Sequence, residues 1–207
     1  MELGFHEFPS GKKYTYIVLE GKRVFLRNIV FLTTATDPST FVIVHEWGMP
    51  QKGRWEPPKG QMEWKEFQDA NVKPGSVVSK SQLATHMRKA ALREMIEESY
   101  ILPKDVDNFR MLPLSYRQDW PESGLPGVQF MYVYWAGTIK KPVVTHARKR
   151  ILEVVRNPEW KAVLPPDLCE KDDMMWWNPT DGWDTIRTGF SKKMTRMYIE
   201  YITKYGI

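Results

Sequence analysis

The chain has 207 residues, of which 42% are hydrophobic and 27% are charged, and its formal net charge is +5. This composition excludes a mainly disordered chain, and the length suits one domain with a substantial core. No apolar run approaches the roughly eighteen residues that a membrane-spanning helix needs, and the N-terminus lacks the apolar core of a signal peptide. The single Cys169 cannot form an internal disulfide, so we expect a cytoplasmic protein with no membrane partner.

The first part of the chain predicts strands followed by a loop. Residues 14–19 and 24–32 are rich in β-branched and aromatic residues and predict two strands, with Gly21 at the turn between them. The apolar run 41–44 predicts a short buried strand. Residues 48–60 are rich in glycine and proline and predict a loop.

A long helix is expected next, from an N-cap at Ser81 to Glu98. Apolar residues recur on it at helical spacing and predict its buried side. These residues are Leu83, Met87, Ala90, Ala91 and Met95.

The second half of the chain predicts further strands at 112–116, 128–139 and 174–177. Helices are expected at 145–156 and along an apolar stripe from residue 194 to 205.

The succession of strands and helices predicts an α/β fold with a mixed sheet. We find no internal repeat and no linker. We expect residues 1–27 to form N-terminal strands or an extension, packed on a main domain of residues 28–207.

Three glutamates of the expected helix stand at positions i, i+3 and i+4: Glu94, Glu97 and Glu98. On an α-helix they project from one face, one turn apart. The crowding stabilises an isolated helix little, but the carboxylate oxygens suit a hard divalent cation such as Mg²⁺ or Mn²⁺. The alternative interpretation is a solvated helix face, on which Arg93 pairs with Glu97.

This segment resembles the Nudix box, a motif of glycine, five residues, glutamate, seven residues and then Arg-Glu-apolar-x-Glu-Glu-x-Gly-apolar. Gly60 and Glu66 match its first half at the family spacing. Its second half is matched by Arg93, Glu94, Met95, Glu97, Glu98 and Ile101.

The chain departs from the box in two places. Between Glu66 and Arg93 lie 26 residues where the family has seven, so a 19-residue insertion interrupts the motif. Tyr100 stands where the family has a glycine that ends the helix in a left-handed conformation. Because a tyrosine adopts that conformation only at some cost, we expect this helix end to be built differently.

The flank before the box is Trp-Glu-Pro-Pro-Lys-Gly, residues 55–60. It is similar to the mRNA-decapping members of the family, including those of large DNA viruses, and to the dinucleoside-tetraphosphate hydrolases. The prolines hold the approach extended, and Gly60 lets the backbone come close to a phosphate or a metal. The resemblance implies that the backbone carbonyl of Lys59 is a metal ligand, and we expect the Lys59 ammonium to meet a polyphosphate.

The resemblance implies a Nudix-type α/β/α sandwich, with a mixed β-sheet between helices and the box as a loop-helix-loop. It also implies hydrolysis of a phosphoanhydride bond, in which metal and basic side chains neutralise negative charge in the transition state. Glu94, Glu97 and Glu98 are the implied ligands of Mg²⁺ or Mn²⁺. One of them or a later carboxylate is expected to orient or deprotonate the attacking water. Glu66 and Arg93 are the implied salt bridge that shapes the loop.

Many Nudix enzymes use a further acidic residue beyond the box. Glu153 lies on the expected basic helix, in the region where decapping members keep theirs. Glu170 stands six residues before Trp176, where another branch has an acidic residue. Both candidates stay open, and an ordinary surface charge is the alternative for each.

Basic residues are concentrated in the segment 140–161, which carries a net charge of +5. Clustered cations of this kind suit a polyanion such as RNA. The candidate RNA contacts are Arg148, Lys149 and Arg150, and a solvated basic helix is the alternative.

The chain contains nine tryptophans, and aromatic faces can stack nucleotide bases. Trp55 and Trp120 are candidates for substrate binding, together with Lys59 and Gly60. Core packing is the alternative for each tryptophan.

Three functions are compatible with these patterns. The first is removal of the 5′ cap from mRNA with release of m7GDP, which the basic segment and the Pro-Lys-Gly flank favour. The second is the same chemistry on a dinucleoside polyphosphate such as diadenosine tetraphosphate, or on a diphosphoinositol polyphosphate. The third is a non-catalytic Nudix-like binding domain, which the survival of all three carboxylates disfavours. A homodimer is plausible for the family, but no interface is identifiable.

Overall fold

A computed structural model describes residues 1–70 and 72–206 of the chain. In chain order the strands are β1 (Leu3–Glu7), β2 (Lys13–Leu19), β3 (Lys22–Thr33), β4 (Phe41–Glu46), β5 (Trp55–Glu56), β6 (Lys59–Gln61), β7 (Val106–Asp119), β8 (Gln129–Ile139) and β9 (Lys171–Trp177). The α-helices are α1 (Lys80–Ser99), α2 (Lys141–Arg156), α3 (Pro158–Val163) and α4 (Phe190–Tyr205). The 3-10 helices are η1 (Trp64–Ala70), η2 (Pro103–Asp105), η3 (Pro121–Ser123), η4 (Pro166–Cys169) and η5 (Pro179–Asp181).

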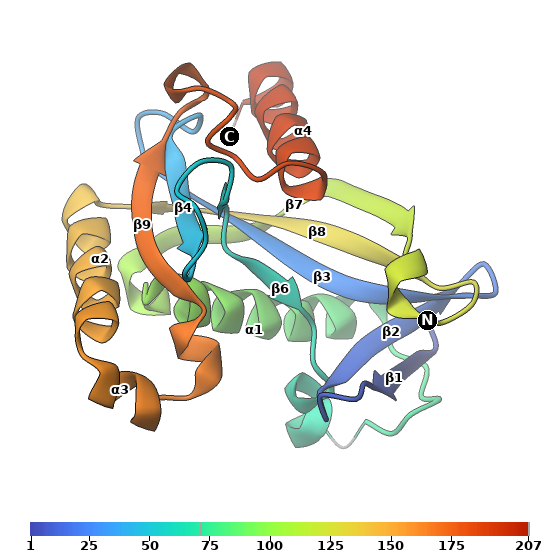
Figure 1. Ribbon diagram of the computed structural model, residues 1–207. Coiled ribbons are helices and arrows are strands. Elements are labelled where there is room, and N and C mark those ends of the chain that lie inside the picture. The colour runs from blue at the N-terminus through green and yellow to red at the C-terminus, as the bar shows by residue number, and fades with distance from the viewer. Residues whose placement is uncertain (71, 207) are drawn as a thin grey trace.

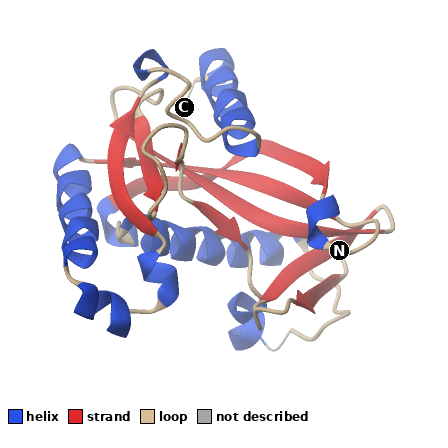
Figure 2. Ribbon diagram, viewed as in Figure 1, coloured by secondary structure: helices blue, strands red, loops and turns tan. Residues whose placement is uncertain are grey.

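The sheet is built around β3. This strand pairs in parallel with β8, which in turn pairs antiparallel with β7. On its other side β3 pairs antiparallel with β2, β6 and β4, and β4 continues to β5 and β9. Figures 1 and 2 show α1 running along one face of this sheet and α4 lying on the other. The expected α/β/α arrangement with a mixed sheet is confirmed.

Alternate residues of β3 are buried on opposite faces of the sheet, as the pleat of a strand requires. The residues that pack with α1 and α2 include Leu26, Val30 and Leu32. The residues that pack with α4 include Phe25, Ile29 and Phe31. Because apolar burial on both faces fixes the register of β3, it also fixes the position of β6, which borders the site described below.

Helix α1 begins earlier than expected, with Ser79 rather than Ser81 as its N-cap. The Ser79 hydroxyl accepts a hydrogen bond from the Gln82 N–H at 3.1 Å, and the Gln82 side chain accepts one from the Ser79 N–H at 2.9 Å. This reciprocal pair is a capping box. The five apolar residues expected on its buried side are all buried.

The expectation that α1 ends in an unusual geometry is wrong. Tyr100 takes up the left-handed conformation itself, with φ 56° and ψ 14°, and its N–H donates to the carbonyl of Ile96 at 2.9 Å. Its hydroxyl donates to the carbonyl of Leu168 in η4 at 2.5 Å. This contact offsets the cost of a non-glycine residue in that conformation and joins the end of α1 to η4.

The 19-residue insertion lies between η1 and the last turns of α1, and includes the first turns of the helix. Residues 72–79 run beside β1. The Leu3 N–H donates to the carbonyl of Ser76 at 3.0 Å, and the Val78 N–H donates to the carbonyl of Met1 at 2.9 Å. The insertion therefore lengthens α1 and attaches the N-terminal strands to the rest of the fold.

Other expected elements are present with shifted ends. The expected loop 48–60 contains β5 and the start of β6, and the strand expected at 112–116 is part of the longer β7. The helix expected at 145–156 begins at Lys141, and β1 and α3 are additional elements.

The expected boundary between residues 27 and 28 lies inside β3, so the N-terminal strands share one sheet with the remainder. None of the described helices is both long and apolar enough to span a membrane.

Candidate active site

Glu94 and Glu98 of α1 lie under the edge of β6, with exposed fractions of only 8% and 4%. Gly60 in β6 passes so close to Glu94 that a Cβ atom at position 60 would stand 1.9 Å from Oε2 of that carboxylate. Any side chain there would displace it. The glycine is therefore required by the close approach of the strand to the helix.

The outer edge of β6 presents backbone groups to the same carboxylates. Neighbouring residues of a strand direct their N–H and C=O groups to opposite edges. The Lys59 N–H donates to Oε2 of Glu98 at 2.7 Å, and the Gln61 carbonyl accepts a hydrogen bond from Nη2 of Arg93 at 3.0 Å. The carbonyl of Lys59 shares the direction of its N–H, which places a backbone oxygen on the side where the resemblance implies a metal ligand.

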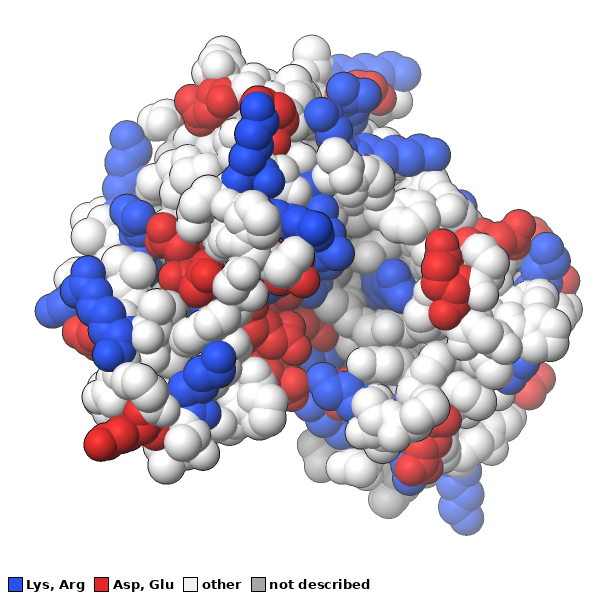
Figure 3. Space-filling model, viewed as in Figure 1, with Lys and Arg blue, Asp and Glu red and all other residues white. Residues whose placement is uncertain are grey.

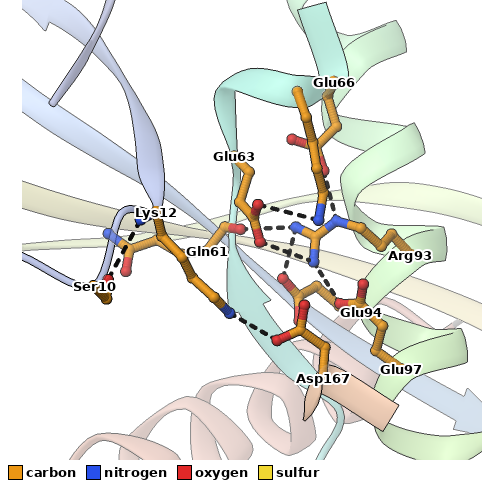
Figure 4. A network of polar contacts seen from close by, with 10 residues as sticks. Ser10, Lys12, Gln61, Glu63, Glu66, Arg93, Glu94, Glu97 and Asp167 are labelled. Atoms are coloured by element: carbon orange, nitrogen blue, oxygen red, sulfur yellow. Dashed lines mark hydrogen bonds and ion pairs between the residues drawn. The ribbon is translucent and has the colours of Figure 1, made fainter. Parts of the chain in front are cut away.

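Arg93 is the centre of an ion-pair network, shown in Figure 4. Its guanidinium nitrogens lie 2.6 Å from Glu66, 2.5 Å from Glu97 and 2.9 Å from Glu94. Glu63 lies 3.6 Å away on the same network. The salt bridge between Glu66 and Arg93 is thus formed although 26 residues separate the two in the sequence.

A second cluster of charges lies around Glu56, whose side chain is 1% exposed. Its carboxylate lies 3.0 Å from Nζ of Lys59 and 3.6 Å from Nζ of Lys171, and it accepts a hydrogen bond from the Ser191 hydroxyl at 2.5 Å. Burial would raise the pKa of Glu56, but these two ammonium groups and the hydroxyl hold that pKa at about 2. Lys171 also lies 2.9 Å from Glu98, so it joins the two clusters.

The carboxylates of the box are poorly neutralised for groups so deeply buried. Burial raises the pKa of Glu94 to about 8; Arg93 opposes this rise, and the charges of Glu98 and Glu97 add to it. Burial also raises the pKa values of Glu97 and Glu66, again against the effect of Arg93. A carboxylate whose ionised form is this disfavoured gains from any additional positive charge nearby.

These groups line a cleft. Figure 3 shows acidic side chains gathered in the middle of one face, where the surface is hollowed, with Lys and Arg side chains around them. Lys12, from the turn between β1 and β2, reaches to Asp167 of η4 at 2.8 Å (Figure 4). The cleft is also lined by Tyr14, Arg27, Tyr132 and Glu170. An adjoining hollow shares Lys59 and Glu170 and reaches Glu98 and Lys171.

The donor set of the site fits a hard divalent cation in its chemistry. Within residues 1–70 and 72–206, no three His, Cys, Asp or Glu side chains stand together in the arrangement of a metal site. Glu94 and Glu97 are turned to Arg93, and Glu98 is turned to Lys171. The available donors are nevertheless all oxygens, from carboxylates and one backbone carbonyl, as Mg²⁺ and Mn²⁺ prefer. Burial raises the pKa of Glu94 to about 8 although Arg93 opposes the rise, so a further positive charge beside this carboxylate would favour its ionised form.

The two tryptophans expected at the substrate do not line the cleft. Trp55 is 5% exposed and belongs to the apolar cluster beneath α4, which is the core packing named as the alternative to its predicted role in substrate binding. Trp120 packs against Phe8 and Phe25, and the guanidinium of Arg27 lies 4.5 Å from its ring centroid. Trp120 therefore supports a residue of the cleft and does not line it.

Lys59 is also more constrained than expected. Its ammonium is held by Glu56 at 3.0 Å and its side chain is only 20% exposed, although the residue lines the cleft. Its positive charge is paired with the buried carboxylate of Glu56.

The two candidates for a further acidic residue are separated by the structure. Glu170 lines the cleft, and burial raises its pKa, with the charge of Glu98 adding to the rise. Glu153 lies exposed on α2, 3.8 Å from Lys149, and does not line the cleft.

The basic residues of α2 do not form one continuous surface. Arg148 binds both carboxylate oxygens of Asp173, at 2.7 and 2.9 Å. Lys149 is the partner of Glu153, and Arg150 lines a separate hollow beside Tyr100. Consecutive residues of a helix point about 100° apart, so only part of the expected charge is available on any one side.

Several residues of the site were not anticipated from the sequence. Glu56 directly follows the candidate Trp55 in the sequence, and Lys171 directly follows the candidate Glu170. Glu63 lies within the box itself. Lys12 and Asp167 stand 155 residues apart, and no sequence pattern links them.

No protein-family model and no curated protein matches the chain, but solved structures resemble it at low identity. The Nudix domain of Shewanella oneidensis NrtR complexed with ADP ribose is 14% identical, with a TM-score of 0.46, over 87% of this chain and 90% of that one. The E. coli dihydroneopterin triphosphate pyrophosphohydrolase is 10% identical, with a TM-score of 0.47, over 85% and 95% of the two chains. The C. elegans Ap4A hydrolase is 14% identical, with a TM-score of 0.41, over 87% and 98%. At these values, the function has to be inferred from the residues of the cleft.

Proposed function

We propose that this chain is a divalent-metal-dependent hydrolase of phosphoanhydride bonds, of the Nudix type. The observation that carries the proposal is the convergence of Glu94 and Glu98 on the edge of β6, where Gly60 allows the contact and Lys59 presents its backbone. Three crowded carboxylates, one of which has a pKa of about 8, are costly in a domain that only binds a partner. They are useful in a site that loads a cation and a polyphosphate.

In this proposal Mg²⁺ or Mn²⁺ is held by Glu94, Glu97, Glu98 and the backbone carbonyl of Lys59. When bound, the ion supplies positive charge to the phosphate oxygens, on which negative charge accumulates during hydrolysis. Arg93 then keeps Glu66 as its partner.

The residues of the chain itself have three tasks. The salt bridge of Glu66 with Arg93 holds the segment before α1 against the helix that carries the carboxylates. Lys171 lines the adjoining hollow and holds Glu98 at 2.9 Å. Glu170 lines the cleft, and no ion pair holds it within the described part of the chain. We assign it to accept the proton of the attacking water.

We propose capped RNA as the substrate, with release of m7GDP. The flank of residues 55–60 and the basic segment 140–161 support this choice, although Arg148 and Lys149 are engaged by acidic partners. A dinucleoside polyphosphate or a diphosphoinositol polyphosphate is the alternative, because the cleft chemistry is the same for each.

The experiment is a hydrolysis assay in Mg²⁺ or Mn²⁺ on three substrates: cap-labelled RNA, diadenosine tetraphosphate and a diphosphoinositol polyphosphate. Release of m7GDP from the RNA supports decapping. Turnover confined to a small substrate supports phosphoanhydride hydrolysis and contradicts capped RNA as the substrate. Failure on all three, by a folded protein, contradicts the proposal.

A further inference from the structure

Two side-chain donors that line the cleft lack an acceptor. Nε of Arg27 and Nε2 of Gln61 are buried and have no hydrogen-bond partner among the described residues. Both residues line the same cleft as Glu94. A buried donor left without an acceptor costs about 1–3 kcal/mol, so two of them side by side point to an acceptor that binds from outside the chain.

The two donors belong to one face of the sheet. Arg27 of β3 and Gln61 of β6 are directly opposite each other in the antiparallel pair, so their side chains leave the sheet on the same side. Arg27 is also in register with Tyr132 of β8, and its Nη1 donates to the Tyr132 hydroxyl at 3.3 Å. Gly60, the residue before Gln61 in β6, faces Glu94 on the opposite side of the strand. The cleft therefore has donors on one side of β6 and carboxylates on the other.

Arg27 differs from the other cations of this cleft. Lys12 is held by Asp167 at 2.8 Å, Lys59 by Glu56 at 3.0 Å, and Arg93 by the carboxylates of the box. No ion pair joins Arg27 to a carboxylate in residues 1–70 and 72–206. Its charge therefore stays available to a ligand.

Aromatic rings fix the position of this free charge. The guanidinium of Arg27 lies 4.5 Å from the ring centroid of Trp120, 4.6 Å from that of Phe130 and 5.6 Å from that of Tyr132. Such contacts hold a cation in place without neutralising it. A pre-positioned guanidinium loses little conformational entropy when it binds a phosphate, and its fork geometry matches phosphate oxygens.

We propose that Arg27 and Gln61 form a phosphate subsite, which binds a phosphate of the substrate next to the one held at the carboxylates. The identity of the ligand as a polyphosphate rests on the proposed function. The subsite selects substrates whose phosphate chain is long enough to meet the carboxylates and Arg27 together, and it leaves a single phosphate group weakly bound.

Binding without turnover tests the subsite. The probes are inorganic tripolyphosphate and a methylene-bridged analogue of diadenosine tetraphosphate, titrated calorimetrically in Mg²⁺. Arg27→Gln is expected to weaken binding of both probes about 10- to 100-fold, because a charge-assisted hydrogen bond is lost. Arg27→Lys keeps the charge, loses the fork and is expected to fall between Arg27→Gln and the wild type.

Two further variants separate this role from a structural one. Gln61→Glu removes the second donor and gives Arg27 a carboxylate within the protein. It is expected to weaken binding at least about tenfold without lowering the temperature of unfolding. Arg23→Gln removes the same charge from the same face of β3, outside the cleft, and is expected to change the dissociation constant less than about twofold.

The subsite is overturned if Arg27→Gln binds both probes as the wild type does, if Arg23→Gln loses as much affinity as Arg27→Gln, or if the wild type binds neither probe. The proposed function is judged separately. A chain that binds through Arg27 and hydrolyses no phosphoanhydride keeps the subsite and loses the function. If Arg27→Gln binds the probes and hydrolyses the substrate as the wild type does, the proposed function stands and the subsite is overturned.

Discussion

Gly60 lies so close to Glu94 that a Cβ atom at position 60 would stand 1.9 Å from the carboxylate oxygen, so any other residue displaces that carboxylate or the strand. Gly60→Ala therefore moves Glu94 or the strand. We expect kcat/KM to fall at least about 100-fold, because displacement of a reacting group by an ångström has effects of this size. The free energy of unfolding should fall by about 1–3 kcal/mol.

Gly137→Ala is the matched control for that variant. A Cβ atom there would stand 2.5 Å from Cγ1 of Val106, in a part of the sheet that does not line the cleft. It should lose comparable stability and keep its kcat/KM. Equal losses of activity in the two variants would show that strain in the sheet, and not the contact with Glu94, matters.

Arg93→Lys tests the ion-pair network around Arg93, at the start of the turn of α1 that carries Glu94 and Glu97. Lysine keeps the charge but cannot reach Glu66, Glu97 and Glu94 together, because it lacks the planar fork. We expect a loss of about 2–4 kcal/mol in the free energy of unfolding and at least about tenfold in kcat. Urea unfolding and steady-state kinetics give the two values.

Arg148→Lys provides the comparison, since Arg148 also binds a carboxylate bidentately but is half exposed. Its loss should stay below about 1 kcal/mol, with unchanged kcat on diadenosine tetraphosphate. If Arg93→Lys behaves like Arg148→Lys, the network is not needed for catalysis.

The lowered pKa of Glu56 should make the free energy of unfolding depend on pH. Its pKa in the folded protein is about 2, below the ordinary value of 4.5, so its ionised form stabilises the fold. This contribution of about 3 kcal/mol is complete above pH 4.5 and is lost as the pH falls through about 2. Glu56→Gln should therefore be less stable than the wild type by about 3–5 kcal/mol at pH 6, where it also leaves buried cations unpaired.

Urea unfolding of both proteins between pH 6 and pH 2.5 measures this difference. The stability gap between wild type and Glu56→Gln should narrow as the pH falls below 4.5. Glu153→Gln, at an exposed position on α2, should show no such gap. A gap that is constant with pH would mean that the charge of Glu56 does not stabilise the fold.

The fold could be predicted from the sequence where a local residue pattern is compatible with a single secondary structure. The buried strands and the apolar side of α1 follow from periodicity, and Glu94, Glu97 and Glu98 follow from the box. The left-handed conformation of Tyr100 is accompanied by a hydrogen bond from its hydroxyl to the carbonyl of Leu168, a contact that no local pattern contains.

The remainder of the site depends on pairings over long distances in the chain. Arg27 and Gln61 meet only because β6 pairs with β3 in one register, and Lys12 meets Asp167 across 155 residues. The position of Trp55 also depends on the tertiary structure. Its place in the sequence, next to the Nudix-like box, suggests a contact with the substrate. In the folded chain, Trp55 is buried beneath α4.

The proposed contact of RNA with α2 is tested by reversing the charge of the basic residues that acidic partners hold least. Because Arg148 is held by Asp173, we expect Lys149→Glu with Arg150→Glu to produce most of the effect of reversing all three residues. The kcat/KM on long capped RNA should fall at least about fivefold at low salt, and less at high salt. Hydrolysis of diadenosine tetraphosphate should not change; an equal loss on both substrates argues against an RNA path along α2.

Glu98→Gln shows whether the carboxylates of α1 carry the proposed reaction. The amide keeps the shape of the side chain and can still accept the Lys59 N–H, while Lys171 retains Glu56 as a neighbour. Measured with Mg²⁺ beside the control Glu153→Gln, the folded Glu98→Gln protein should retain less than about 1% of the wild-type hydrolysis rate, and the control should retain all of it. Hydrolysis at the wild-type rate by folded Glu98→Gln would contradict the account.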